Sequence, residues 1–220
     1  LTNLRLIGDV VADIFLGKIT KWNDVRIAAV NPGMKLPDQT INVIYRSDGS
    51  GTTFVFTDYL SKISTEWKDK FGAAKSVPFP VGIAAKGNPG VAGVLSSTEY
   101  AIGYVGSEYA FAQNLSMAEL QNANGDWVKP TTATIAAAAT GEMPTDTRVS
   151  ITNSTAANAY PISLFTWLIV YKEQSYGGRT YEHAKAVSDL LKYMMDPKTQ
   201  AQTEKVNYAP LPEKIRQQSL

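Results

Sequence analysis

A strand-like run, a glycine-rich turn and a helical pattern follow one another without a gap between residues 41 and 63, and this succession strongly constrains the fold. Residues 41–45 (INVIY) are rich in β-branched side chains and follow the turn signal Pro37-Asp38, so they predict a strand. Residues 52–63 (TTFVFTDYLSKI) predict a helix, because apolar side chains recur on one face. That face consists of Phe56, Tyr59, Leu60 and Ile63.

The remainder of the chain continues this alternation of strand-like and helical segments. Residues 101–105 (AIGYV) and 163–171 (SLFTWLIVY) predict strands, and the second is the most β-like run of the sequence. Residues 131–139 predict a helix that follows Pro130, and residues 180–195 predict a core-facing helix that ends before Pro197. The core-facing positions of this last helix are Ala184, Val187, Leu191 and Met194. The alternation indicates an α/β fold, without internal repeats or low-complexity tracts.

The turn between the first strand and helix, YRSDGSGTT, combines groups that favour an anion. A strand that leads through such a turn into a helix directs unpaired backbone N–H groups and the positive end of the helix dipole at one point. Ser50 and Thr52 add hydroxyl donors, Gly49 and Gly51 permit close approach of the backbone, and Arg46 adds a planar guanidinium that matches an oxyanion. The loop therefore predicts an anion site.

Asp48 lies two residues after Arg46 and has a different expected role. Its carboxylate can orient the guanidinium and partly neutralise a charge that would be costly to bury alone. Serine, aspartate, glycine and threonine are also common helix-cap and turn residues. A helix N-cap with an incidental surface ion pair therefore remains an alternative interpretation of the same loop.

Several other functional classes lack their residues. The nearest approach to a nucleotide P-loop, residues 82–88, has no lysine and hydroxyl after its second glycine, and the nucleophile elbow of a serine hydrolase would need glycine where Asp48 stands. The only histidine, His183, lies within a predicted helix, and with no cysteine a metal site would depend on scattered carboxylates. The 21 basic and 20 acidic residues nearly balance, so the chain lacks the excess of positive charge that attracts nucleic acid. We expect no enzyme activity, no cofactor and no nucleic-acid partner.

Around the loop, the sequence resembles the phosphate-binding proteins of the phosphate-specific ABC importer. The shared motifs occur in order and extend over almost the whole chain. They are ADIFLGKITKWN (residues 12–23), YRSDGSGTTFVFTDYL (residues 45–60), GNPGVAG (residues 87–93), IGYV (residues 102–105), VKP (residues 128–130), YPI (residues 160–162) and YAPLP (residues 208–212).

The resemblance implies a two-lobed periplasmic binding protein of type II-like architecture. Such a protein closes around one inorganic phosphate and delivers it to the membrane subunits of an ABC permease, in the periplasm or at the extracytoplasmic cell surface. By matching residues, Arg46, Ser50, Gly51 and Thr52 would contact phosphate, and Asp48 would brace Arg46. A relative that has kept the fold for a structural or signalling role without a ligand is the alternative.

The resemblance also implies a division of the chain. Residues 1–160 would form the second lobe, which is complete and carries the RSDGSGT loop, and residues 161–220 would form the C-terminal part of the first lobe. Members of the family have an N-terminal segment that completes the first lobe and supplies further groups that bind phosphate. That segment has no counterpart before Leu1. Since the chain does not begin with Met, we expect that an upstream segment has been removed. A separate N-terminal chain, or another copy, would then complete the first lobe.

Overall fold

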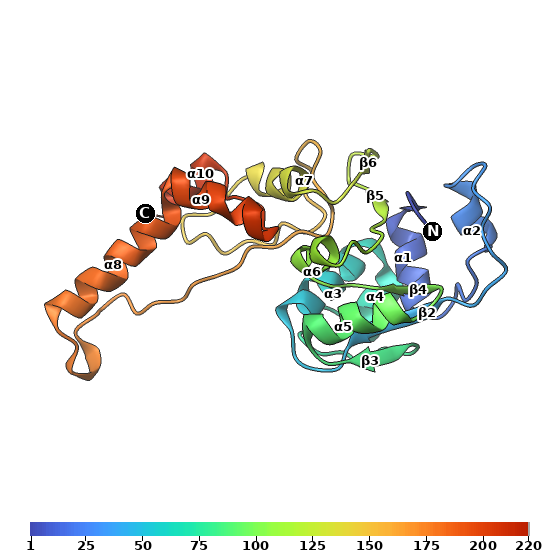
Figure 1. The fold of residues 1–220 in the computed structure, drawn as a ribbon, viewed down its shortest axis with the longest axis horizontal. Coiled ribbons are helices and arrows are strands. Elements are labelled where there is room, and N and C mark those ends of the chain that lie inside the picture. The colour runs from blue at the N-terminus through green and yellow to red at the C-terminus, as the bar shows by residue number, and fades with distance from the viewer. Residues whose placement is uncertain (220) are drawn as a thin grey trace.

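The computed structural model describes residues 1–219 and contains a parallel sheet of three strands, which lies at the lower right in Figure 1. β2 (Asn42–Arg46) lies between β3 (Ile83–Ala85) and β4 (Ala101–Gly103). The strand predicted at residues 41–45 is therefore present with its bounds moved by one residue, and the strand predicted at residues 101–105 ends two residues earlier.

Both faces of this sheet are covered by helices. Successive side chains of β2 point to opposite faces, and each face packs against a different hydrophobic cluster. Val43 belongs to the main hydrophobic cluster, together with residues of α1 (Gly8–Phe15) and α3 (Gly51–Ile63). Ile44 belongs to a second cluster with residues of α5 (Gly87–Ser97). The sheet is thus the middle of three layers, which confirms the α/β fold predicted from the alternating pattern.

α3 has the expected buried face, and the connection that follows it depends on one glycine. Phe56, Tyr59 and Leu60 are buried, and Ile63 packs against the same cluster. α4 (Thr65–Lys70) and a loop then lead to Gly82, where φ is +109° and an added Cβ would lie 2.4 Å from the Val43 carbonyl oxygen. Only glycine allows the chain to pass β2 so closely.

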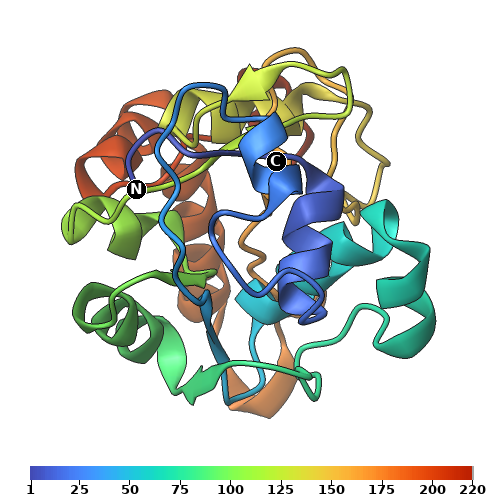
Figure 2. The same cartoon turned by 90° about the vertical axis from the view of Figure 1, so that its right-hand side faces the viewer.

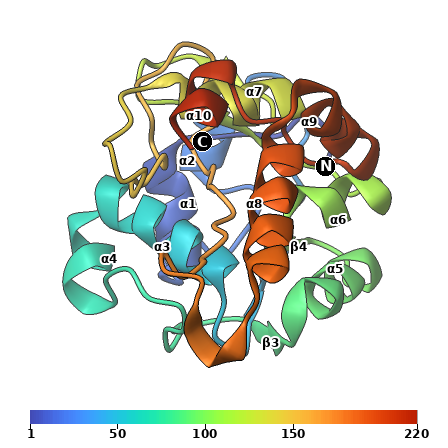
Figure 3. The same ribbon diagram turned by 90° about the vertical axis from the view of Figure 1, so that its left-hand side faces the viewer.

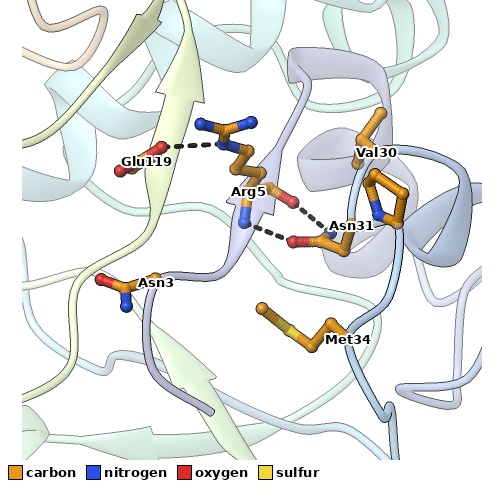
Figure 4. Close-up of a pocket in the computed structure, with 7 residues that line it drawn as sticks. Asn3, Arg5, Val30, Asn31, Met34 and Glu119 are labelled. Carbon is orange, nitrogen blue, oxygen red and sulfur yellow. Dashed lines mark hydrogen bonds and ion pairs between the residues drawn. The ribbon is translucent and has the colours of Figure 1, made fainter.

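A smaller sheet shares the main hydrophobic cluster with the body, the name we give to the three-stranded sheet and the helices that pack around it, among them α1, α3 and α5. β5 (Glu119–Gln121) pairs in parallel with β1 (Arg5–Leu6) and antiparallel with β6 (Trp127–Val128). Asn31 lies shortly after α2 (Val25–Ala29). Its side-chain amide bonds the backbone at the outer edge of β1, where a further strand would otherwise pair (Figure 4). The Arg5 backbone N–H donates to Asn31 Oδ1 at 2.9 Å, and Asn31 Nδ2 donates to the Arg5 carbonyl oxygen at 2.8 Å.

The helices that follow β6 lie to the left of the three-stranded sheet in Figure 1, and in Figure 2, which looks from the right of Figure 1, the red and orange helices lie behind the body. α7 (Thr132–Ala137) begins at a capping box formed by Thr131 and Thr134, and continues as a short 3-10 helix, so the helix predicted at residues 131–139 is confirmed. α6 (Ser107–Ala112) belongs to the body, whereas α9 (Pro197–Thr203) and α10 (Glu213–Gln218) lie near α7.

Residues 163–195, which we call the arm, extend away from both groups. An extended segment leads outward, a short 3-10 helix (Tyr176–Gly178) turns the chain, and α8 (Tyr181–Met195) leads back, as Figures 1 and 3 show. The strand predicted at residues 163–171 is wrong, because no residue there is in a strand. A β-rich sequence forms a strand only when a neighbour supplies ladder hydrogen bonds, and no strand of residues 1–219 lies beside it.

α8 confirms the predicted helix but not its predicted environment. Thr180 caps it, and it ends at Met195, before Pro197. None of its residues is buried, so the prediction that it faces the core is wrong. The four apolar positions predicted to face the core are only half-buried, because α8 lies in the arm. Tyr193, on the same helix, is 63% exposed.

The division into lobes after residue 160 stays a prediction. A small cluster of Ala138, Ala139, Ile151 and Ala159 lies before this point, and Phe165, after it, packs against the same cluster. Within residues 1–219, no helix has the length and apolar character needed to cross a membrane.

Candidate anion-binding site

The predicted loop lies where the carboxyl ends of three parallel strands meet. Arg46 ends β2, Ala85 ends β3 and Tyr104 directly follows β4. From β2 the chain passes first to one neighbour, β3, and then to the opposite neighbour, β4, so the strand order reverses at this edge. Open α/β sheets bind ligands outside the carboxyl ends of their strands at such a point.

Ser50 caps α3 and thereby fixes the amino end of this helix at the loop. Its Oγ accepts hydrogen bonds from the N–H groups of Thr52, at 3.0 Å, and Thr53, at 3.4 Å. The helix cap considered for the loop is therefore present. It is compatible with anion binding, because the hydroxyl proton of Ser50 is not used by the cap and the N–H of Gly51 has no partner within its helix.

Arg46 and Asp48 form a two-point ion pair. Arg46 Nε donates to Asp48 Oδ1 at 2.9 Å, and Arg46 Nη2 donates to Asp48 Oδ2 at 2.6 Å. The side chain of Arg46 is only 9% exposed, whereas that of Asp48 is 36% exposed. The expected bracing contact is therefore present, and the low exposure of Arg46 argues against an incidental surface pair.

The amino end of α5 holds the same two side chains. Arg46 Nη1 donates to Asn88 Oδ1 at 2.7 Å, and the Gly87 backbone N–H donates to Asp48 Oδ1 at 2.9 Å. Asp48 thus accepts from both Arg46 and the helix that follows β3. The β2–α3 loop and the start of α5 are joined by charged hydrogen bonds, which fix the guanidinium from two directions.

Tyr104 contacts both the end of β2 and the start of α3 through its hydroxyl. Its hydroxyl accepts the Arg46 backbone N–H at 3.2 Å and lies 2.8 Å from the hydroxyl oxygen of Thr53. Its ring stacks on Phe56 with centroids 4.4 Å apart, and Phe56 in turn contacts Phe15. The aromatic core of the body therefore determines where the backbone of Arg46 lies.

The pKa shifts agree with these contacts. The hydrogen bonds from Arg46, and then from the Gly87 N–H, hold the pKa of the Asp48 carboxyl far below its usual range. The hydrogen bond to Asp48 raises the pKa of Arg46, and burial raises the pKa of the Tyr104 hydroxyl. Near neutral pH the site therefore contains a cation, an anion and a neutral phenol.

The loop is open on the side of its glycines. A Cβ added to Gly49 or Gly51 would meet no atom within 4 Å, and both residues are exposed. A separate hollow is lined by Arg5, Asn31 and Glu119, but these groups bind one another (Figure 4). In residues 1–219 no group of three or more His, Asp and Glu side chains is placed to hold a metal ion.

The loop sequence predicts the contact between Arg46 and Asp48, but it does not predict Asn88 and Tyr104 as their partners. Both lie just beyond strand ends, Asn88 after β3 and Tyr104 after β4. The motifs GNPGVAG and IGYV, which contain Asn88 and Tyr104, indicate the family resemblance but not these contacts. Parallel pairing of the strands before these residues with β2 is the signal that brings them to the same edge of the sheet.

Comparison with known proteins identifies the family. The model of the PBP superfamily domain matches residues 2–198. The phosphate-binding protein PstS of Xylella fastidiosa strain Temecula1 is 43% identical over 98% of this chain and 58% of its own length. The protein of the same name from Pasteurella multocida is 44% identical over 97% of this chain and 62% of its own. The chain thus spans about 60% of the length of these relatives.

Solved structures agree on the fold. A human phosphate-binding apolipoprotein, 20% identical, matches with a TM-score of 0.70 over 98% of this chain and 65% of its own. A phosphate-binding protein from Stenotrophomonas maltophilia, 18% identical, matches with a TM-score of 0.60 over 98% of this chain and 64% of its own. The resemblance predicted from the sequence motifs is confirmed, and this chain belongs to the PBP superfamily, with PstS proteins among its relatives.

Proposed function

We propose that this chain binds inorganic phosphate as the solute-binding component of a phosphate ABC importer. The observation that carries the proposal is the buried guanidinium of Arg46, held by Asp48 beside the open amino end of α3. Its relatives are named phosphate-binding proteins, and one fold neighbour is described as a substrate-binding protein with bound phosphate. Arg46, Ser50, Gly51 and Thr52 would contact the anion, and Asp48 would brace Arg46.

The proposal places the protein outside the cytoplasm, in the periplasm or at the cell surface, with the membrane subunits of an ABC permease as partners. It also makes the protein a binder that releases phosphate unchanged. The only histidine of the sequence, His183, lies exposed on α8, and the loop joins Ser50 to backbone N–H groups instead of to a base.

Titration with phosphate, and with sulfate as a second anion, tests the binding. The wild-type chain, Arg46→Ala and Lys86→Ala are compared by NMR, which detects weak binding. Lys86 is a matched control because it is an exposed cation at the cap of α5. Losing charge-assisted hydrogen bonds of about 1.5–3 kcal/mol each should weaken binding at least tenfold in Arg46→Ala. Lys86→Ala should change it less than threefold, as an exposed charge contributes about 0–1 kcal/mol.

Equal losses in the two variants would show that the loop is not the site. A wild-type chain that binds neither anion, alone or with added partner chains, would favour the ligand-free structural or signalling relative.

We further propose that the arm is covered in the working protein, by a separate N-terminal chain or by another copy of this chain. Ile169 is 94% exposed and Tyr171 68% exposed on its extended segment, and Leu190 is 57% exposed on α8. Large apolar side chains left exposed in such number favour association when they gather in one patch. Intact-mass measurement and light scattering on the purified protein should detect a second polypeptide or a dimer. A stable, soluble monomer at high concentration would contradict this.

A further inference from the structure

We propose that Asn88 is a positioning residue, which determines how Arg46 presents its N–H groups to an anion. The inference rests on the proposed function, because it deepens the role of the same loop. Asn88 is the second residue of α5, whereas Arg46 ends β2, 42 positions earlier in the chain. The contact between them therefore exists only in the folded molecule.

The hydrogen bonds of the guanidinium can be counted. Arginine has five N–H donors and no acceptor. Arg46 uses Nε–H and one Nη2–H on Asp48, and one Nη1–H on Asn88 Oδ1. One N–H on each terminal nitrogen is left for a ligand. Without Asn88, three would be left, and nothing would hold Nη1 in its present direction.

The orientation of the Asn88 amide follows from this chemistry. Since Arg46 has only donors, the amide must present its oxygen to Nη1. That oxygen is neutral, so Asn88 holds the guanidinium without adding negative charge to the site. An aspartate at the same position would hold Arg46 equally well but would place a second carboxylate beside Asp48.

Charge explains why orientation matters here. The positive charge of Arg46 and the negative charge of Asp48 cancel, so the pair attracts an anion mainly through directed N–H groups and little through net charge. The attraction between such groups and an oxyanion falls steeply when they are misaligned. A residue that only aligns them should therefore change affinity although it changes no charge.

The experiment compares Asn88→Ala and Asn88→Asp with the wild-type chain, with Asn23→Ala, at an exposed asparagine before α2, as the control. Phosphate titration by NMR should show about tenfold weaker binding for Asn88→Ala. This is the loss expected when one charged hydrogen bond between Arg46 and the anion is misaligned. Asn88→Asp should bind more weakly still, because the site then carries a net negative charge. Asn23→Ala should match the wild type.

A second readout separates positioning from a general structural role. Rotation about the Cζ–Nη1 bond of Arg46 exchanges its two protons, and NMR of the guanidinium at low temperature measures that exchange without any ligand. Loss of the Asn88 acceptor should accelerate the exchange at Nη1 while the Nε–H signal, held by Asp48, stays in place. The melting temperature should change little.

The outcomes are distinct for the two proposals. Unchanged phosphate affinity in Asn88→Ala, or equal or tighter binding in Asn88→Asp, overturns the positioning role and leaves the proposed function intact. If the wild type does not bind phosphate, alone or with added partner chains, the proposed function fails, and the ligand-free exchange rates decide the positioning role. Identical Nη1 exchange in wild type and Asn88→Ala overturns it in that case.

Discussion

Replacing Tyr104 with phenylalanine should destabilise the protein although it removes a single oxygen atom. The hydroxyl lies 3.2 Å from the Arg46 backbone nitrogen and 2.8 Å from Thr53 Oγ1, and Thr53 is fully buried. Without it, one N–H and one buried hydroxyl lose their partner. A buried polar group left unsatisfied costs about 1–3 kcal/mol. Because the Arg46 N–H is only partly buried, we expect a total loss of about 2 kcal/mol for the two groups.

Urea denaturation measures this loss as a lower midpoint at constant slope, and thermal melting should show a decrease of about 4–8 °C for a chain of this size. Tyr193→Phe, which changes the same atom on an exposed residue of α8, should stay within about 0.5 kcal/mol of the wild type.

A double-mutant cycle with Thr53→Val sharpens the test. When both hydroxyls of a buried pair are removed, neither is left unsatisfied, so the double variant should be more stable than the sum of the single changes by about 1 kcal/mol. A Tyr104→Phe variant as stable as the wild type would refute the reasoning. Strict additivity of the two changes would show that the 2.8 Å contact contributes nothing to stability.

The other predictions concern the same loop and the glycines around it. Asp48→Asn should weaken phosphate binding although it removes a negative charge, because Arg46 loses its two-point partner; tighter binding by titration would contradict this. The pKa of Asp48 is lowered in the folded protein, so its contribution to stability is complete above the unfolded pKa, about 3.9, and is lost as pH falls through the folded value. Asp48→Asn should therefore flatten the acid side of a plot of unfolding free energy against pH, and equal slopes in both proteins would refute the linkage. Gly82→Ala should lower the urea midpoint strongly, because its Cβ would lie 2.4 Å from a carbonyl oxygen, whereas Gly49→Ala, with open space around it, should leave the midpoint nearly unchanged and reduce phosphate affinity. Phosphate binding by the 220-residue chain alone should be weak, with a dissociation constant of about 1 mM, or about 4 kcal/mol. It should also discriminate poorly against sulfate, because Asp48, the only carboxylate of the loop, already accepts hydrogen bonds from Arg46 and Gly87 and does not accept the phosphate proton. Micromolar, selective binding by a verified monomer would refute this.

Local patterns were sufficient for elements whose stability comes from their own residues and nearest neighbours. β2, α3 and α7 lie where the sequence predicts them, because β-branched content, a serine or threonine cap and helical spacing act within a few residues. The ion pair of Arg46 and Asp48 was predictable for the same reason, since two residues of one turn can reach each other whatever the remainder of the chain does.

The most β-like run of the sequence shows the limit of this reasoning. Residues 163–171 have the composition of a buried strand, yet they form none, because a strand needs hydrogen bonds from a neighbour and composition alone does not supply one. α8 shows the same limit for a helix. Its cap and its end are local and were predicted, but burial of its apolar face depends on what lies opposite.

The sequence by itself determined the α/β pattern, the superfamily and the chemistry of the Arg46 loop. Only the tertiary structure decided that Asn88 and Tyr104 hold Arg46, because contacts across 42 and 58 residues depend on which strands pair with β2 and in which register. Parallel pairing places the ends of β3 and β4 beside the end of β2, so that residues distant in the sequence meet at one edge. Propensity and spacing describe a chain over a few residues, whereas the register of a sheet is a property of the whole fold.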